Sequence, residues 1–155
     1  MRGMYVTLLW IHSWWRWVVL LTAVVALVHA CVGLFGRRSF TPRSRTPGAL
    51  FVGALDLQLL VGLILYVFVS PLTSAAFADM GGAMRNPELR FWAVEHGPSM
   101  LLVVALAHIG SVRARRAATD ALRYRRLVTW FGIACVLMLA AHPWPWLDIG
   151  RPLVR

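Results

Sequence analysis

Four long apolar stretches divide this chain of 155 residues, and they constrain its fold more than any other feature. They cover about residues 6–36, 49–71, 91–112 and 127–142. A helix needs about 20 mainly apolar residues to cross a bilayer, and inside lipid its backbone must satisfy its own hydrogen bonds. Hydrophobic residues make up 59% of the chain and charged residues only 14%, which leaves no stretch for a separate soluble domain. The sequence therefore predicts an all-α, integral membrane four-helix bundle in which residues 1–155 form one four-span domain.

The arginines predict how this bundle is oriented, because loops rich in Lys and Arg stay on the cytoplasmic side. Ten arginines follow the first and third stretches: Arg37, Arg38, Arg43, Arg45, Arg113, Arg115, Arg116, Arg123, Arg125 and Arg126. Five lie toward the other side: Arg2, Arg85, Arg90, Arg151 and Arg155. We therefore expect two Arg-rich cytoplasmic loops, N and C termini outside, and residence in a bacterial cytoplasmic (inner) membrane.

The same arginines account for the net charge of +10, so a nucleic-acid partner is not needed to explain it. Proteins that bind single strands alternate basic and aromatic residues along a groove, and no segment of this chain has that pattern. The lipid bilayer is the partner that the composition predicts.

All five histidines lie within or at the end of apolar stretches, where an ionisable side chain is expensive and usually functional. The predicted orientation sorts the polar residues into two layers. The outer layer holds His12, Arg16, Arg90, Glu95, His96 and His142. The inner layer, closer to the cytoplasm, holds His29, Asp56, Gln58 and His108. Such a distribution predicts a ligand site inside the bundle.

Paired imidazoles from neighbouring helices are typical axial ligands of b-type haem. His12 with His96 would form an outer haem site, with Arg16 and Arg90 pairing with the propionates, and His29 with His108 would form an inner one. At about 100° per residue, however, the 17 residues from His12 to His29 turn the second side chain roughly 100° from the first. One haem is therefore favoured over two.

Two other interpretations of these polar residues remain open. The outer cluster of His12, Glu95, His96 and His142 could bind copper, since imidazole suits such metals. In the inner layer, Asp56 could accept a hydrogen bond from a histidine and form a structural clasp between spans without any cofactor.

Several short motifs occur one after another along the chain. They are His12-Ser13-x-x-Arg16-Trp17, Gln58-x-x-x-Gly62-x-x-x-Tyr66, Ser70-Pro71, Arg90-Phe91 followed by Glu95-His96, His108-x-Gly110 and Pro143-Trp144-Pro145. With them the chain resembles the small four-helix bacterial membrane proteins described as cytochrome b-like, which are grouped near copper-resistance membrane proteins. The resemblance covers most of the chain. It implies the four-helix fold, polar residues at the outer face and haem as the cofactor.

Three functions follow from these observations. The first is a haem b electron carrier or subunit, linked to quinol oxidation, in which His96 pairs with His12 or His142. The second is a copper-binding or copper-transporting membrane protein. The third is a cofactor-free accessory subunit of a larger respiratory or photosynthetic membrane complex. Hydrolytic motifs are absent from the sequence, so a carrier or subunit is favoured over a stand-alone enzyme.

Overall fold

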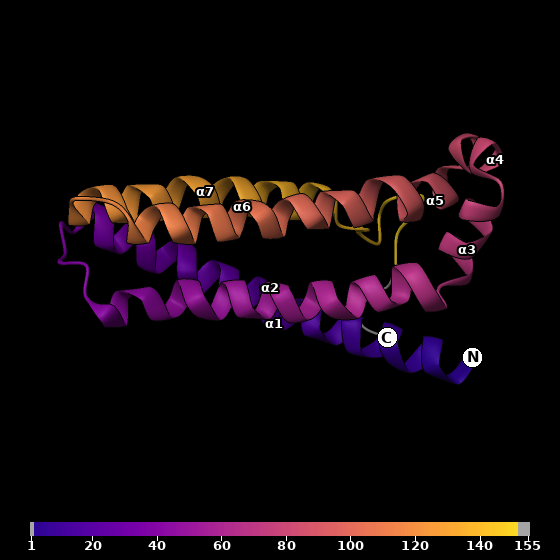
Figure 1. The fold of residues 1–155 in the computed structure, drawn as a ribbon, viewed down its shortest axis with the longest axis horizontal. Coiled ribbons are helices and arrows are strands. Elements are labelled where there is room, and N and C mark those ends of the chain that lie inside the picture. The colour runs from indigo at the N-terminus through magenta and orange to yellow at the C-terminus, as the bar shows by residue number, and fades with distance from the viewer. Residues whose placement is uncertain (1, 152–155) are drawn as a thin grey trace.

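Long helices run side by side along the whole length of the molecule in the computed structural model, which describes residues 2–151 (Figure 1). The described residues form helices, turns and loops and no strand, so the predicted all-α class is confirmed. Three helical stretches are long and apolar enough to cross a membrane, namely Gly3–Phe35, Pro42–Val69 and Pro87–Arg115. Arg155 and the side chain of Arg2, which were assigned to the outer side, lie outside the described part.

The first two long helices are joined by a tight connection. Helix α1 (Arg2–Phe35) continues for 34 residues because proline is absent from it, and it ends where Arg37 adopts a left-handed φ of 50°. A 3₁₀ turn, η1 (Pro42–Arg45), then leads into α2 (Thr46–Ile64). A π-helical turn, η2 (Leu65–Val69), extends α2 and ends before Ser70-Pro71, because the residue preceding a proline is biased away from the helical conformation.

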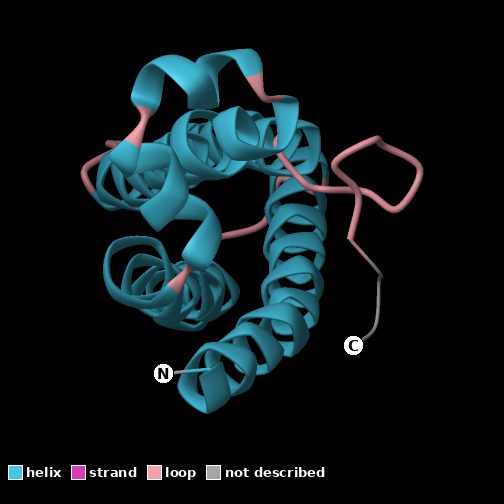
Figure 2. Cartoon of the chain, turned by 90° about the vertical axis from the view of Figure 1, so that its right-hand side faces the viewer, coloured by secondary structure: helices cyan, strands magenta, loops and turns pink. Residues whose placement is uncertain are grey.

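Three short helices connect the second stretch to the third: α3 (Pro71–Ala78), α4 (Met80–Arg85) and α5 (Pro87–Arg90). Each begins with a side chain that accepts backbone N–H groups, supplied by Ser70, Asp79 and Asn86. They lie across one end of the bundle (Figure 2). No helix was predicted between the apolar stretches that end at residue 71 and begin at residue 91, so the sequence did not predict these three helices.

The remaining helices complete the bundle. A π-helical turn, η3 (Phe91–His96), leads into α6 (Gly97–Arg115), and Pro98 occupies the first turn of α6, where its missing N–H costs little. Helix α7 (Asp120–Ala140) begins seven residues before the predicted fourth stretch, because Thr119 caps it and its first turns carry arginines. It packs against α6 and α1, and the aromatic pair Phe51 and Phe131 lies in the shared core.

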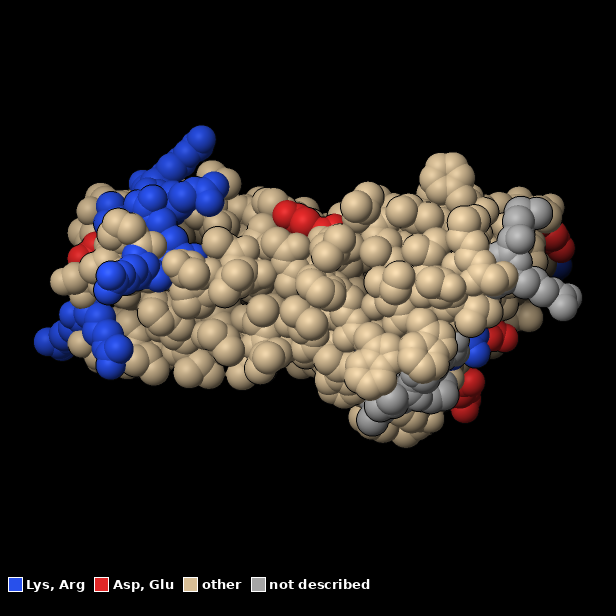
Figure 3. Space-filling view, turned by 90° about the horizontal axis from the view of Figure 1, so that it is seen from below, with Lys and Arg blue, Asp and Glu red and all other residues tan. Residues whose placement is uncertain are grey.

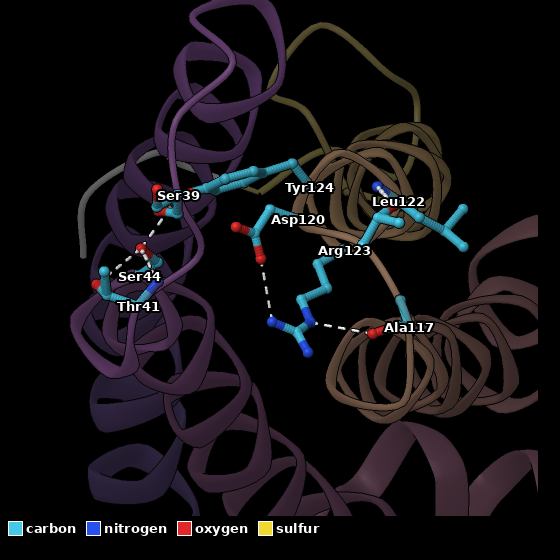
Figure 4. Close-up of polar contacts among 9 residues, drawn as sticks. Ser39, Thr41, Ser44, Ala117, Asp120, Leu122, Arg123 and Tyr124 are labelled. Atoms are coloured by element: carbon cyan, nitrogen blue, oxygen red, sulfur yellow. Dashed lines mark hydrogen bonds and ion pairs between the residues drawn. The ribbon is translucent and has the colours of Figure 1, made fainter.

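The arginines of the α1–α2 and α6–α7 connections gather at one end of the molecule, while the long middle of the body is almost uncharged (Figure 3). At this end Tyr124 of α7 reaches the α1–α2 connection (Figure 4). Its hydroxyl lies 3.2 Å from the carbonyl oxygen of Ser39 and 3.1 Å from Oγ of Ser44. Because Tyr124 is only 1% exposed, these contacts join three elements in a dry environment.

Tyr124→Phe is expected to lower the free energy of unfolding by about 0.5–1.5 kcal/mol, since the hydrogen bonds of the buried Tyr124 hydroxyl to Ser39 and Ser44 are lost while Oγ of Ser44 keeps its contacts with Thr41. Unfolding of the detergent-solubilised chain, followed by circular dichroism, measures the difference. Tyr5→Phe is the matched control, because no hydrogen bond joins the Tyr5 hydroxyl to another described residue. Equal stability of the two variants would contradict a role for the Tyr124 hydroxyl.

Candidate functional site

A cavity of about 210 Å³ lies toward the end of the bundle opposite the arginine-rich connections. Its wall is built from the first half of α1, the second half of α2 with η2, the start of α6 and the segment after α7. Most of the wall is apolar. The ionisable or amide side chains lining it are Tyr5, His12, Arg16, Gln58, Tyr66, His96, His142 and Arg151. Three of the five histidines of the chain therefore converge here from different elements.

The closest pair of imidazoles is that of His12 on α1 and His96 at the end of η3. Their ring centroids are 6.5 Å apart and their planes are inclined at 76°. These two residues are 84 positions apart in the sequence, so their approach is a product of the fold. The outer-layer pairing expected from depth alone is thus present in the geometry.

Hydrogen bonds to the backbone hold both sides of this pair in place. Nδ1 of His96 lies 3.1 Å from the carbonyl oxygen of Ala141, so a proton on Nδ1 is donated there and Nε2 keeps its lone pair. Nε2 of Gln58 donates to the carbonyl oxygen of His12 at 3.0 Å, which joins α2 to α1 beside the ring. Nδ1 of His12 is buried without a hydrogen-bond partner among the described residues. A buried, unsatisfied imidazole nitrogen is costly and is typical of functional sites.

Two glycines leave space for these aromatic side chains. A Cβ added at Gly62 would lie 3.1 Å from Cε1 of His12, and one added at Gly97 would lie 2.9 Å from Cε2 of Tyr66. Both glycines therefore permit α2 and α6 to approach rings that a larger residue would displace.

His142 follows α7 and is buried, with its ring 4.3 Å from that of Trp144. Burial, and to a smaller extent the positive charge of Arg16 and the neighbouring His96, together lower the pKa of His142 to about 4. The imidazole is therefore neutral at pH 7.

This lowered pKa predicts how stability depends on pH. In the unfolded chain His142 takes up a proton near pH 6.5, whereas in the folded chain it does so only near pH 4. The unfolded state thus binds more protons between these values, so stability is full above pH 6.5 and falls as the pH drops toward 4. Between pH 7 and pH 5 we expect His142 alone to contribute a loss of about 2 kcal/mol. The free energy of unfolding of the detergent-solubilised chain and of His142→Gln, measured at both pH values, gives this contribution. If the free energy of unfolding depended on pH in the variant as it does in the wild-type chain, His142 would not be its source.

The two arginines predicted for the outer site have different positions. Arg16 lines the cavity, whereas Arg90 forms an ion pair with Glu95 at 2.7 Å and is not among the lining residues. Arg151 takes a place on the wall that the sequence did not predict, stacking 5.3 Å from the Trp92 ring while pairing with Glu88 at 2.6 Å. The only feature of the sequence that points to Arg151 is its position shortly after the Pro143-Trp144-Pro145 segment.

The copper ligand set expected from the sequence is not assembled. Glu95 is 47% exposed and paired with Arg90, apart from the cavity that His12, His96 and His142 line. Within residues 2–151 no three His, Cys, Asp or Glu side chains are placed to hold one metal ion.

The structure does not pair His29 with His108, the two residues predicted to form an inner haem site. Nε2 of His108 lies 2.8 Å from Oδ1 of Asp56. This contact between α6 and α2 corresponds to the alternative in which Asp56 and a histidine form a structural clasp between spans. The His29 ring instead lies 6.2 Å from that of Tyr124. Gln58 was predicted to lie in the same inner layer. It instead lines the cavity beside His12, so this prediction was wrong.

No family model, curated protein or solved structure matches the chain.

Proposed function

We propose that the chain binds one b-type haem in the outer cavity, with His12 and His96 as axial ligands, and acts as a membrane electron carrier or haem-carrying subunit. The observation that supports it best is the spacing of the two imidazoles. Two imidazoles that would hold one metal ion must lie close together, because each ligating nitrogen binds at about 2 Å. The observed separation of their ring centroids is 6.5 Å.

The chain's own residues supply what such a ligand pair needs. The Ala141 carbonyl orients His96 and leaves Nε2 for ligation, which is the usual support of a ligating histidine. Arg16 brings positive charge to the cavity wall, where a carboxylate group of a ligand can pair with it, whereas the charge of Arg151 on the same wall is paired with Glu88. The apolar remainder of the wall excludes water from the imidazoles. Haem, when bound, supplies one-electron chemistry, and quinol is the electron donor that fits a membrane carrier.

The membrane arrangement is part of the same proposal. Helix α7 serves as the fourth span, and the arginine-rich connections face the cytoplasm of a bacterium, so that the cavity opens near the outer face of the inner membrane. The resemblance to small cytochrome b-like membrane proteins agrees with this arrangement. A site close to one membrane face allows electrons to pass to a partner protein docked there.

An optical spectrum of the full chain, produced with an adequate haem supply and purified in detergent, tests the proposal. Binding to two imidazoles predicts sharp α and Soret bands in the reduced-minus-oxidised spectrum and a stoichiometry of one haem per chain. Absence of haem, together with failure of the apoprotein to take up added haem, would refute it and favour the accessory-subunit alternative. Copper found by elemental analysis in place of haem would also refute it.

A further inference from the structure

A histidine–carboxylate pair lies on the outer surface of the bundle, far from either end of its helices. Nε2 of His108 on α6 and Oδ1 of Asp56 on α2 are 2.8 Å apart, and the two side chains are 50% and 48% exposed. Both residues belong to candidate membrane spans, and Asp56 stands midway along Pro42–Val69. Acidic atoms interrupt the otherwise uncharged middle of the body in Figure 3. Ionisable groups at such depth almost always face protein or water, so lipid is a poor neighbour for this surface.

The residues around the pair allow another helix to come close. On α2, Gly53 and Leu60 are exposed and share the face of Asp56, because they lie three residues before it and four residues after it. On α6, the small residue Ala105 is exposed three positions before His108. A Cβ added at Gly53 would meet nothing within 4 Å. Small residues beside polar side chains are characteristic of packed interfaces between membrane helices.

We propose that this surface, formed by Gly53, Asp56, Ala105 and His108, is the interface between two copies of the chain. When the pair holds two protons and so carries no net charge, one proton lies between Nε2 and Oδ1, and the pair retains one unused donor, Nδ1 of His108, and one unused acceptor, Oδ2 of Asp56. Neither atom has a partner among the described residues. The pair is therefore complementary to itself.

A two-fold axis along the membrane normal explains why the occupant is a second copy. Such an axis places the same residues of both copies at the same depth and makes the contact isologous. Nδ1 of His108 can then donate to the carboxylate of the partner subunit's Asp56, and the reverse bond forms by symmetry. A different protein would need an acceptor and a donor of its own at that depth. This inference rests on the proposed membrane arrangement but uses no residue of the haem site, so its test is separate from the test of haem binding.

The first test measures self-association of the full chain in lipid vesicles, by energy transfer between donor-labelled and acceptor-labelled copies as lipid dilutes them. Gly53→Leu fills the space needed by the partner helix and is expected to raise the dissociation constant at least tenfold. Gly132→Leu on α7 is the matched control, because a Cβ at Gly132 also meets nothing within 4 Å. It is expected to leave association unchanged.

The second test locates the interface without relying on a bulky substitution. In a variant with Cys31 and Cys135 replaced by alanine, Gly53→Cys is expected to form a disulfide-linked dimer on oxidation in the membrane, whereas Gly132→Cys is not. A wild-type chain that remains monomeric at every protein-to-lipid ratio would overturn the proposal. Stronger cross-linking from Gly132→Cys, or a complex with a different protein in place of the dimer, would overturn it as well.

Discussion

Replacing His96 by alanine is expected to reduce the haem content of the purified chain to less than about a tenth of the wild-type level. Loss of residues that merely support a ligand already costs about 10–100-fold in metal affinity, so loss of the ligand itself costs at least as much. His12→Ala is expected to have the same effect, because the two imidazoles would share one iron. Haem is quantified against protein by the pyridine haemochrome spectrum, after purification in the presence of added haem.

Two histidine variants outside the cavity serve as controls for that prediction. His29→Ala and His108→Ala remove imidazoles that lie beside Tyr124 and Asp56 and do not line the cavity. Both are expected to keep the haem bands of the wild-type chain. Full haem content in His96→Ala would exclude His96 as a ligand, and loss of haem in His29→Ala but not in His96→Ala would move the site to the inner layer.

Much of the outer site could be predicted from the sequence, because helix ends determine depth. His12 lies ten residues into α1, His96 directly precedes α6 and His142 directly follows α7, so alternating helix direction brings all three to the same end of the bundle. The apolar stretches likewise predicted the long helices, since in lipid only helices and closed barrels satisfy their own backbone and a barrel strand needs only about 9–11 residues. Depth, however, does not determine which way a side chain faces.

The residues Asp56 and Gln58 show this limit. They are two positions apart on α2 and so differ little in depth, yet they point roughly 200° apart around the helix. Asp56 reaches His108 on the outer surface, while Gln58 reaches the backbone of His12 beside the cavity. Arg151 was missed for another reason, because its place depends on the path of the loop after α7, for which no periodic pattern exists. The short helices α3 to α5 were missed because segments of four to eight residues show caps but no periodicity.

Gly110→Ala is expected to be among the most destabilising single-methyl substitutions in this chain. A Cβ at Gly110 would come closer than 3.0 Å to Cβ of Trp130, an atom fixed to the α7 backbone that cannot turn aside by changing rotamer. Helices α6 and α7 would have to separate along a contact that also includes Phe131, which is fully buried. Overpacking of this kind costs about 1–3 kcal/mol, and it outweighs the gain of up to about 1 kcal/mol that alanine brings to a helix. Denaturation in detergent, followed by tryptophan fluorescence, measures the change.

Gly132→Ala on α7 isolates the steric origin of this effect. It makes the same chemical change in a helix of the same bundle, but its Cβ would meet nothing within 4 Å. Its stability is expected to equal or exceed that of the wild-type chain, because only the helix propensity changes. If Gly110→Ala were as stable as Gly132→Ala, the close approach of α6 to α7 at Trp130 would be wrong.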